Sequence, residues 1–348
     1  MSDAWRDFLS SAGAEFAGGT VMHFSAPESE RNALRGSVIA DLGHLGLVSV
    51  SGEDAKSFLQ GQLSCDMNRL DPGRSLPGAW CSPKGRVLTV LQVVSRGEAI
   101  LLQMQRDRLE ETLSRLGLYV LRARVRLENA SGRFVRIGLC GEDAAALLGA
   151  AFGDPPVEAD AVVEGGGATM LRLRGPGPRF EVLFEDVDAA RDFWSRATQT
   201  MTPVGAESWD LLDILAGVPT AITADEYLPQ MLNLDQIGAV SFTKGCYVGQ
   251  EIIARAQHLG RVKRRMFQAY IDGDQAPPQH APLYREGSGD EADGRLLVAR
   301  PRPEGGHAAL AVIKLESAEL PLRLGAADGP TVTVAPPPYA RAGDQRSA

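Results

Sequence analysis

The chain has 348 residues, of which 44% are hydrophobic and 23% are charged, and its formal net charge is -8. This length exceeds what one hydrophobic core usually organises, and the composition is that of a folded protein. The acidic balance argues against a general coat for nucleic acid or anionic membranes, so we expect no stable binding to either. No apolar stretch approaches the roughly 18 residues that span a bilayer, and the first residues lack a signal pattern, which predicts a cytoplasmic protein.

The first part of the chain predicts helices and strands in mixed order. Apolar residues at helical spacing over 5–16 indicate an amphipathic helix that stops near Gly18. Residues 47–50 are typical of a strand, and Ser51 to Asp54 resembles a capping box that starts a helix. The sequence Gly-Glu-Asp-Ala at 52–55 recurs at 141–144, after a second predicted strand at 134–139.

The rest of the chain continues as α+β and ends in short apolar runs. Strands are predicted at 87–94, 99–104 and 180–184, and helices at 109–116, 189–197 and 209–215. Runs at 266–271 and 310–313, separated by Pro and Gly clusters, indicate a small all-β barrel or sandwich. We therefore predict an α+β N-terminal part, a small all-β domain after it, and a flexible C-terminal tail.

The cysteines and histidines show no familiar metal or catalytic spacing. Cys65, Cys81, Cys140 and Cys246 include no C-x-x-C pair, and the chain has neither H-E-x-x-H nor a phosphate-binding G-x-x-x-x-G-K-[ST] loop. The five histidines are scattered. The cysteines are therefore predicted to be free thiols in a reducing compartment, and we expect no bound metal.

The densest group of polar residues runs from Asn233 to Glu251, and its last eight residues, from Lys244, read KGCYVGQE. Lys244 lies two residues before Cys246, and a nearby cation favours the reactive thiolate form. A buried cysteine that packs as a small hydrophobe is the alternative. Gln250 and Glu251 could bind a polar ligand, Glu251 could cap a following helix, or they could form an ion pair with Lys244 or Arg255.

Two other features have both a functional and a structural interpretation. The basic run from Arg255 to Arg265 could receive carboxylates or phosphates, or it could be a solvated face. Trp209 could stack on a flat heteroaromatic ring, or it could be part of the core.

The Lys244–Glu251 segment resembles the signature of YgfZ-type proteins, K-G-C-Y-x-G-Q-E, at every specified position. Residues 228–234 and 238–242 before it, and the G-x-D-x-x-x-[FY]-[LM]-Q-G-Q segment at 52–62, are also similar to that family. The resemblance covers roughly residues 38 to 320. It implies an α+β, three-domain fold like that of the aminomethyltransferase of the glycine cleavage system, with a C-terminal β-barrel. In this chain that fold predicts an N-terminal region over 1–250 with two interleaved α+β domains, a β-barrel domain over 251–340 and a flexible tail over 341–348.

The resemblance also implies a function and a set of site residues. It implies tetrahydrofolate as cofactor, iron-sulfur proteins or assembly factors as partners, and a role in making or maintaining iron-sulfur enzymes, including some that modify tRNA. Cys246 and Lys244 would be the functional pair. The residues expected around them or against the folate are Tyr247, Gln250, Glu251, Trp209 and, at a family aromatic position, Leu45.

Two alternatives remain open at this point. A folate-dependent aminomethyltransferase would need a carboxylate shortly after a Gly-rich turn, where this chain has Thr89 and Val90. No Asp or Glu lies between Leu76 and Gly97, so an acid-base or charge-stabilising role has no obvious residue. A non-catalytic scaffold for iron-sulfur assembly partners is the other alternative. We therefore do not expect a classical enzyme.

Overall fold

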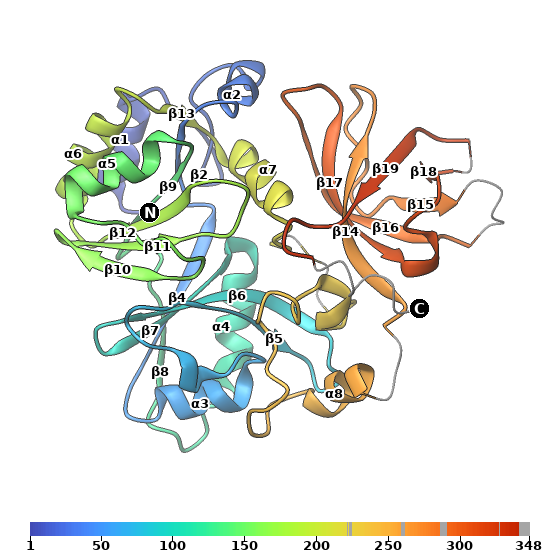
Figure 1. Ribbon diagram of the computed structural model, residues 1–348. Helices are drawn as coiled ribbons and strands as arrows, with labels where there is room; N and C mark the ends of the chain where they lie inside the picture. The colour runs from blue at the N-terminus through green and yellow to red at the C-terminus, as the bar shows by residue number, and fades with distance from the viewer. Residues whose placement is uncertain (221, 223–224, 259–261, 286–290, 327, 341–348) are drawn as a thin grey trace. The chain divides into compact units, whose positions relative to one another are not determined.

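The computed structural model describes residues 1–220, 222, 225–258, 262–285, 291–326 and 328–340 (Figure 1). Two compact units are each built from separate stretches of the chain. Unit 1 comprises Met1–Leu59, Met67–Leu76 and Leu91–Asp210, and unit 2 comprises Gln60–Asp66, Pro77–Val90 and Leu211–Ala348. The predicted tail at 341–348 lies outside the described residues, and the predicted domain boundaries stay predictions.

Unit 1 contains a six-stranded sheet with the order β10-β11-β12-β9-β3-β13. Its strands are β3 (Val38–Asp41), β9 (Val135–Cys140), β10 (Val162–Gly165), β11 (Ala168–Arg172), β12 (Arg179–Phe184) and β13 (Thr202–Val204). Three helices pack on it through one hydrophobic core, namely α1 (Asp3–Ser11), α5 (Asp143–Phe152) and α6 (Val187–Ala197). Trp5 and Trp194 meet edge to face in that core, with ring centroids 5.7 Å apart.

The first helix is shorter than predicted. Helix α1 ends at Ser11, and Phe16 lies instead in the strand β1 (Glu15–Ala17), which pairs with β2 (Thr20–His23). Gly13 adopts a positive φ of 94°, a conformation that glycine tolerates and that ends helices. The helical spacing over 5–16 therefore predicted a helix correctly only in its first half.

The buried carboxylate of Glu30 connects two segments of unit 1 that are far apart in the sequence. It lies in α2 (Pro27–Ala33) and is 1% exposed. One carboxylate oxygen accepts the backbone N–H groups of Phe24 (2.5 Å) and Ser25 (3.2 Å). The other accepts the N–H of Gly205 (2.9 Å) and the hydroxyl of Ser208 (3.5 Å). A single buried carboxylate thus joins segments about 175 residues apart in the sequence.

A second sheet has five strands in the order β5-β6-β7-β4-β8. Its strands are β4 (Leu45–Ser51), β5 (Leu76–Cys81), β6 (Val87–Arg96), β7 (Ala99–Gln105) and β8 (Arg126–Asn129), and the remaining helices of this part of the chain are α3 (Ala55–Gln62), α4 (Leu109–Gly117) and α7 (Ala206–Ala216). The strands predicted at 47–50, 87–94 and 99–104 and the helix at 109–116 are confirmed.

The two predicted strand-to-helix turns also form. Gly52 follows β4 and Gly141 follows β9, with φ values of 110° and 124°. A Cβ on Gly52 would lie 2.1 Å from the carbonyl oxygen of Arg124, so no other residue fits there without movement of the backbone. Helices α3 and α5 begin within three residues of these glycines.

Unit 2 contains the predicted barrel, which is closed in the order β14-β17-β16-β15-β18-β19. Its strands are β14 (Arg264–Ile271), β15 (Pro282–Arg285), β16 (Gly294–Pro301), β17 (His307–Lys314), β18 (Leu322–Leu324) and β19 (Thr331–Ala335). The helix α8 (Gln250–His258) precedes it. The α+β class with a C-terminal barrel is confirmed. No helix among the described residues is both long and apolar enough to cross a membrane.

Candidate functional site

Lys244 fixes the KGCYVGQE segment to another part of unit 2. Its ammonium donates hydrogen bonds to the backbone carbonyls of Leu63 (2.8 Å) and Cys65 (2.7 Å). The same nitrogen lies 5.0 Å from the centre of the Tyr247 ring. A cation held by two carbonyl oxygens and an aromatic face is strongly localised. We call this set of contacts the Lys244 clamp.

Backbone hydrogen bonds add to the clamp on both sides of Cys246. The N–H of Ser241 donates to the carbonyl of Ser64 (2.9 Å), and that of Val248 to the carbonyl of Gly61 (3.3 Å). The hydroxyl of Ser64 reaches the carbonyl of Ala239 at 2.6 Å. The segment is therefore a loop with a defined shape, although it contains no regular secondary structure before α8.

Gly249 has a steric reason to be glycine. It adopts a φ of 82°, and a Cβ at this position would lie 2.5 Å from the carbonyl oxygen of Ser82 and 2.9 Å from the Cα of Gly85. The motif thus passes directly against the Ser82–Gly85 turn, which follows β5. This close approach sets the direction in which α8 leaves the loop.

Cys246 is exposed, whereas Tyr247 beside it is buried. Nothing lies within 4 Å of a Cβ built on Gly245, so the backbone before the thiol is open. The Lys244 ammonium, by contrast, is held by Leu63 and Cys65. The buried-cysteine alternative therefore does not describe Cys246, and the expected contribution of Lys244 is to hold the loop that presents the thiol.

The start of α8 accounts for Gln250 and Glu251. The side-chain oxygen of Gln250 accepts the N–H of Tyr247 at 3.2 Å, a local contact that supports the turn into the helix. Glu251 lies in the first turn of α8, where a negative charge suits the helix dipole, and is exposed. Within the described part of the chain, Glu251 forms no ion pair with Lys244 or Arg255. Their predicted contacts with folate remain predictions.

Burial shifts the protonation of the groups beneath the loop. Desolvation lowers the pKa of Lys244 to about 8, against smaller raising effects of Cys65 and Asp66. Desolvation also raises the pKa of Cys65 to about 11 and that of Cys81 to about 12. These two buried thiols stay protonated at neutral pH, so they are poor nucleophiles.

Trp209 and Leu45 both lie in unit 1 and are buried. A Cβ on Gly138 would come within 2.5 Å of the Trp209 ring, and the guanidinium of Arg179 lies 4.9 Å from the ring centre. Trp209 is 1% exposed, so packing alone explains its position. Leu45 begins β4, and its carbonyl accepts a hydrogen bond from Arg136. Their predicted roles toward folate stay predictions.

Sequence reasoning missed the polar connections of the segment before the motif. Asn233 adopts a left-handed conformation (φ 57°), and its amide donates to the carbonyl of Met266 at 2.7 Å. Arg265 makes two bonds to the Asp235 carboxylate, at 3.0 and 2.9 Å. One member of the basic run thus pairs inside unit 2. An isolated Asn-Leu-Asp followed thirty residues later by Arg carries no sequence signal for this pairing.

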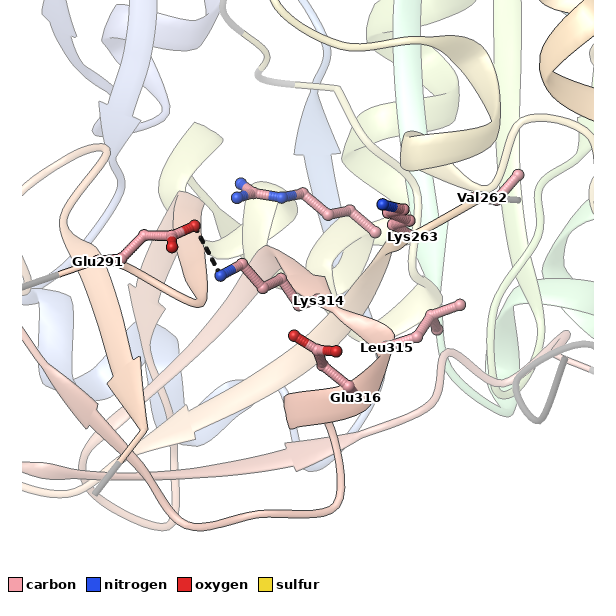
Figure 2. Close-up of a pocket in the computed structure, with 7 residues that line it drawn as sticks. Val262, Lys263, Glu291, Lys314, Leu315 and Glu316 are labelled. Carbon is pink, nitrogen blue, oxygen red and sulfur yellow. Dashed lines mark hydrogen bonds and ion pairs between the residues drawn. The ribbon is translucent and has the colours of Figure 1, made fainter. Parts of the chain in front are cut away.

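Other members of the basic run line a pocket at the end of the barrel, of about 550 Å³. Lys263 and Arg264 line it together with Lys314, Glu291 and Glu316. Glu291 lies 2.8 Å from the Lys314 ammonium, and a dashed line marks this ion pair in Figure 2. Arg261, also in the predicted run, lies outside the described residues. The lining carries both signs of charge, and anion binding by the basic run stays a prediction.

Comparison with known proteins places the chain in a family. The GCVT N-terminal domain model matches residues 12–165. "tRNA-modifying protein YgfZ" of Colwellia psychrerythraea is 36% identical over 232 residues, which cover 66% of this chain and 70% of the relative. The protein of the same name from Edwardsiella ictaluri is 30% identical over 300 residues, which cover 84% and 89%. The chain belongs to the YgfZ family. The resemblance drawn from the motif is thereby confirmed.

A solved structure supports the fold. Glycine cleavage system aminomethyltransferase T from Bartonella henselae matches with a TM-score of 0.79 over 97% of both chains, at 18% sequence identity. The predicted aminomethyltransferase-like fold is therefore confirmed. At this identity the similarity concerns the fold and not the reaction.

Proposed function

We propose that the chain is a tetrahydrofolate-binding protein that supports the assembly or repair of iron-sulfur enzymes, including enzymes that modify tRNA. The observation that carries the proposal is an exposed Cys246 on a loop that the Lys244 clamp holds in place. Membership of the YgfZ family, whose relatives are named as tRNA-modifying, supports it. The free, widely spaced cysteines suit a cytoplasmic protein.

Unit 2 offers polar groups that suit a folate. Both polar atoms of the Gln236 side-chain amide are buried and have no hydrogen-bond partner among the described residues, and the same holds for the side-chain oxygen of Gln230. Buried polar atoms are normally paired, so those left unpaired indicate a ligand or an ordered water. An amide presents a donor and an acceptor side by side, which matches the edge of a reduced pterin.

The residues present support binding more readily than group transfer. When bound, tetrahydrofolate supplies a carrier for one-carbon units. Gln236 would orient its ring, and the clamp would keep Cys246 on a fixed loop. No carboxylate lies between Leu76 and Gly97, the segment where an aminomethyltransferase would need one. We therefore place the aminomethyltransferase alternative second. An assay with the aminomethyl-loaded carrier protein of the glycine cleavage system should show no methylene-tetrahydrofolate above background.

The Gln236→Leu variant tests the folate contact. It should weaken reduced-folate binding about tenfold, because two hydrogen bonds of roughly 0.5 to 1.5 kcal/mol each are lost. Its melting temperature without folate should not fall, since this amide forms no hydrogen bond with the described residues. Calorimetry with several reduced folates and melting curves give both values. Unchanged affinity in a folded variant would remove Gln236 from the site and weaken the case for folate in unit 2.

The Cys246→Ser variant tests the role of the motif. In a bacterial strain without its own family member, it should fail to restore the activity of iron-sulfur enzymes that modify tRNA. Its melting temperature and folate affinity should match the parent, because the thiol is exposed. Cys140→Ser, at a partly buried thiol in β9, is the matched control and should restore activity. Full complementation by Cys246→Ser would remove the thiol from the function, and the motif would then have to act through Lys244, Tyr247, Gln250 or Glu251.

A further inference from the structure

Large apolar side chains gather in the turn between α4 and β8 in unit 1. Leu118 is 74% exposed, Leu121 is 88% exposed and Tyr119 is 41% exposed. We call residues 118–121 the apolar turn. Single exposed leucines are ordinary on protein surfaces, but three large apolar side chains within four residues are characteristic of interaction sites.

The apolar turn has a fixed backbone. The N–H groups of Leu118, Tyr119 and Val120 donate to carbonyls three residues earlier, at 3.2, 3.0 and 3.2 Å. Leu121 then adopts a φ of 48°. This left-handed conformation is sterically unfavourable for leucine, whereas glycine adopts it without steric cost. Because the Leu121 side chain is almost fully exposed, its packing within unit 1 does not offset this unfavourable backbone conformation.

Arg124 anchors the far end of the turn. Its N–H donates to the Asp54 carboxylate at 2.8 Å, and its guanidinium pairs with Glu53 at 2.6 Å. The Arg124 carbonyl also packs against Gly52, at a distance that leaves no room for a side chain. The leucines are therefore presented on a rigid support and not on a flexible loop, which lowers the entropy lost on binding.

The charge next to the turn points to an acidic partner. Residues 113–127 contain four arginines and no acidic residue. Three of these arginines pair with acids elsewhere in the unit: Arg115 with Glu111, Arg124 with Glu53 and Asp54, and Arg126 with Glu128. Arg122 is exposed and forms no ion pair with any residue that the structure describes. It leaves one positive charge directly beside Leu121.

We propose that the apolar turn and Arg122 form a docking surface for a partner protein, with an apolar pocket for the two leucines and a carboxylate at its rim. A membrane is the weaker occupant, because the chain has a net charge of -8 and the turn offers a single unpaired cation. The surface lies on unit 1 and includes no residue of the KGCYVGQE segment, so it is independent of the folate and thiol proposals.

The Leu121→Gly variant separates docking from folding. Glycine relieves the left-handed strain, so the melting temperature should stay the same or rise. The same change removes the most exposed leucine, so partner binding should fall at least tenfold, and Arg122→Glu should have a similar effect. Val157→Ser is the matched control, because Val157 is an 83% exposed apolar residue elsewhere on unit 1.

The partner is found and measured in two steps. A photoreactive benzoylphenylalanine at position 121, and at position 157 as control, is cross-linked in cells, and the adduct is identified by mass spectrometry. The purified adduct protein is then titrated with the parent and the three variants. Support requires one protein that cross-links only at 121 and binds the parent at least tenfold more tightly than Leu121→Gly and Arg122→Glu. Equal affinities, or no adduct specific to 121, overturn the proposal.

Two further measurements address other occupants. Vesicles of phosphatidylethanolamine and phosphatidylglycerol are sedimented with the parent and with Leu121→Gly. Sedimentation velocity of each protein alone follows self-association. Vesicle binding or self-association that depends on Leu121 would assign the surface to a membrane or to a second copy, and would overturn a partner-protein site.

Discussion

The Lys244→Met variant is expected to lose complementation and to be destabilised by about 2 kcal/mol, a moderate value for two hydrogen bonds from a half-buried ammonium. Methionine fills similar volume but leaves the carbonyls of Leu63 and Cys65 without their donor. The loop should then lose its fixed shape while the thiol stays exposed. Denaturant unfolding, complementation and the rate of Cys246 alkylation measure the three effects.

The Lys84→Met variant is the matched control for Lys244. Lys84 lies on the Ser82–Gly85 turn that the motif contacts, but its side chain is exposed. It should behave as the parent in all three measurements. If Lys244→Met restored activity and kept the parental stability, the clamp would have no functional role.

The Lys244→Met variant should also differ from the parent in how its stability depends on pH. The folded-state pKa of Lys244 is about 8, below its ordinary value of 10.5. Between these values the unfolded chain binds more protons, so this group makes the free energy of unfolding rise with pH. Cys65 and Cys81 act in the opposite sense above about pH 9, because burial raises their pKa values from an ordinary 9.0. The stability gap between parent and Lys244→Met should therefore widen from pH 8 to pH 9.

The Glu30→Ala variant is expected to lose about 3 to 5 kcal/mol of stability. It leaves the N–H groups of Phe24, Ser25 and Gly205 without their acceptor, and each buried unpaired donor costs roughly 1 to 3 kcal/mol. Thermal or denaturant unfolding gives the value. Glu28→Ala, at an exposed position of the same helix, should stay within about 0.5 kcal/mol of the parent.

Glu30→Gln distinguishes hydrogen bonding from volume. Glutamine keeps the size but directs an NH2 group at backbone donors that need an acceptor. It should therefore lie between the parent and Glu30→Ala in stability. A Glu30→Gln variant as stable as the parent would show that neither the negative charge nor the second acceptor oxygen of Glu30 contributes to stability.

The sequence predicted the elements whose signals are local. The barrel strands at 266–271 and 310–313, the two glycine-initiated helices and the YgfZ signature needed only neighbouring residues to be recognised. Phe16 was misassigned because helical spacing continued by chance past Gly13, where the backbone reverses. Periodicity is blind to such a reversal unless the glycine is weighed as a helix end.

The contacts that give the site its form could not be predicted in this way. Lys244 binds the backbone carbonyls of Leu63 and Cys65, and a carbonyl is present at every position of the chain. That the side-chain amide of Gln236 has no hydrogen-bond partner among the described residues becomes visible only when its surroundings are known. Composition and spacing identify which residues carry chemistry, but the partners of those residues are chosen by the tertiary fold.

The Lys244 clamp also has a consequence for the order in which the chain folds. It joins Lys244 to a carbonyl 181 residues earlier in the sequence. Contacts of such long sequence separation form slowly, because the entropy of closing a large loop is lost before the contacts stabilise the chain. During synthesis, Gln60–Asp66 leaves the ribosome long before its partner loop exists. The loop that presents Cys246 is therefore expected to be among the last parts of the molecule to mature, and a nascent chain stalled before residue 244 would present no thiol at this site.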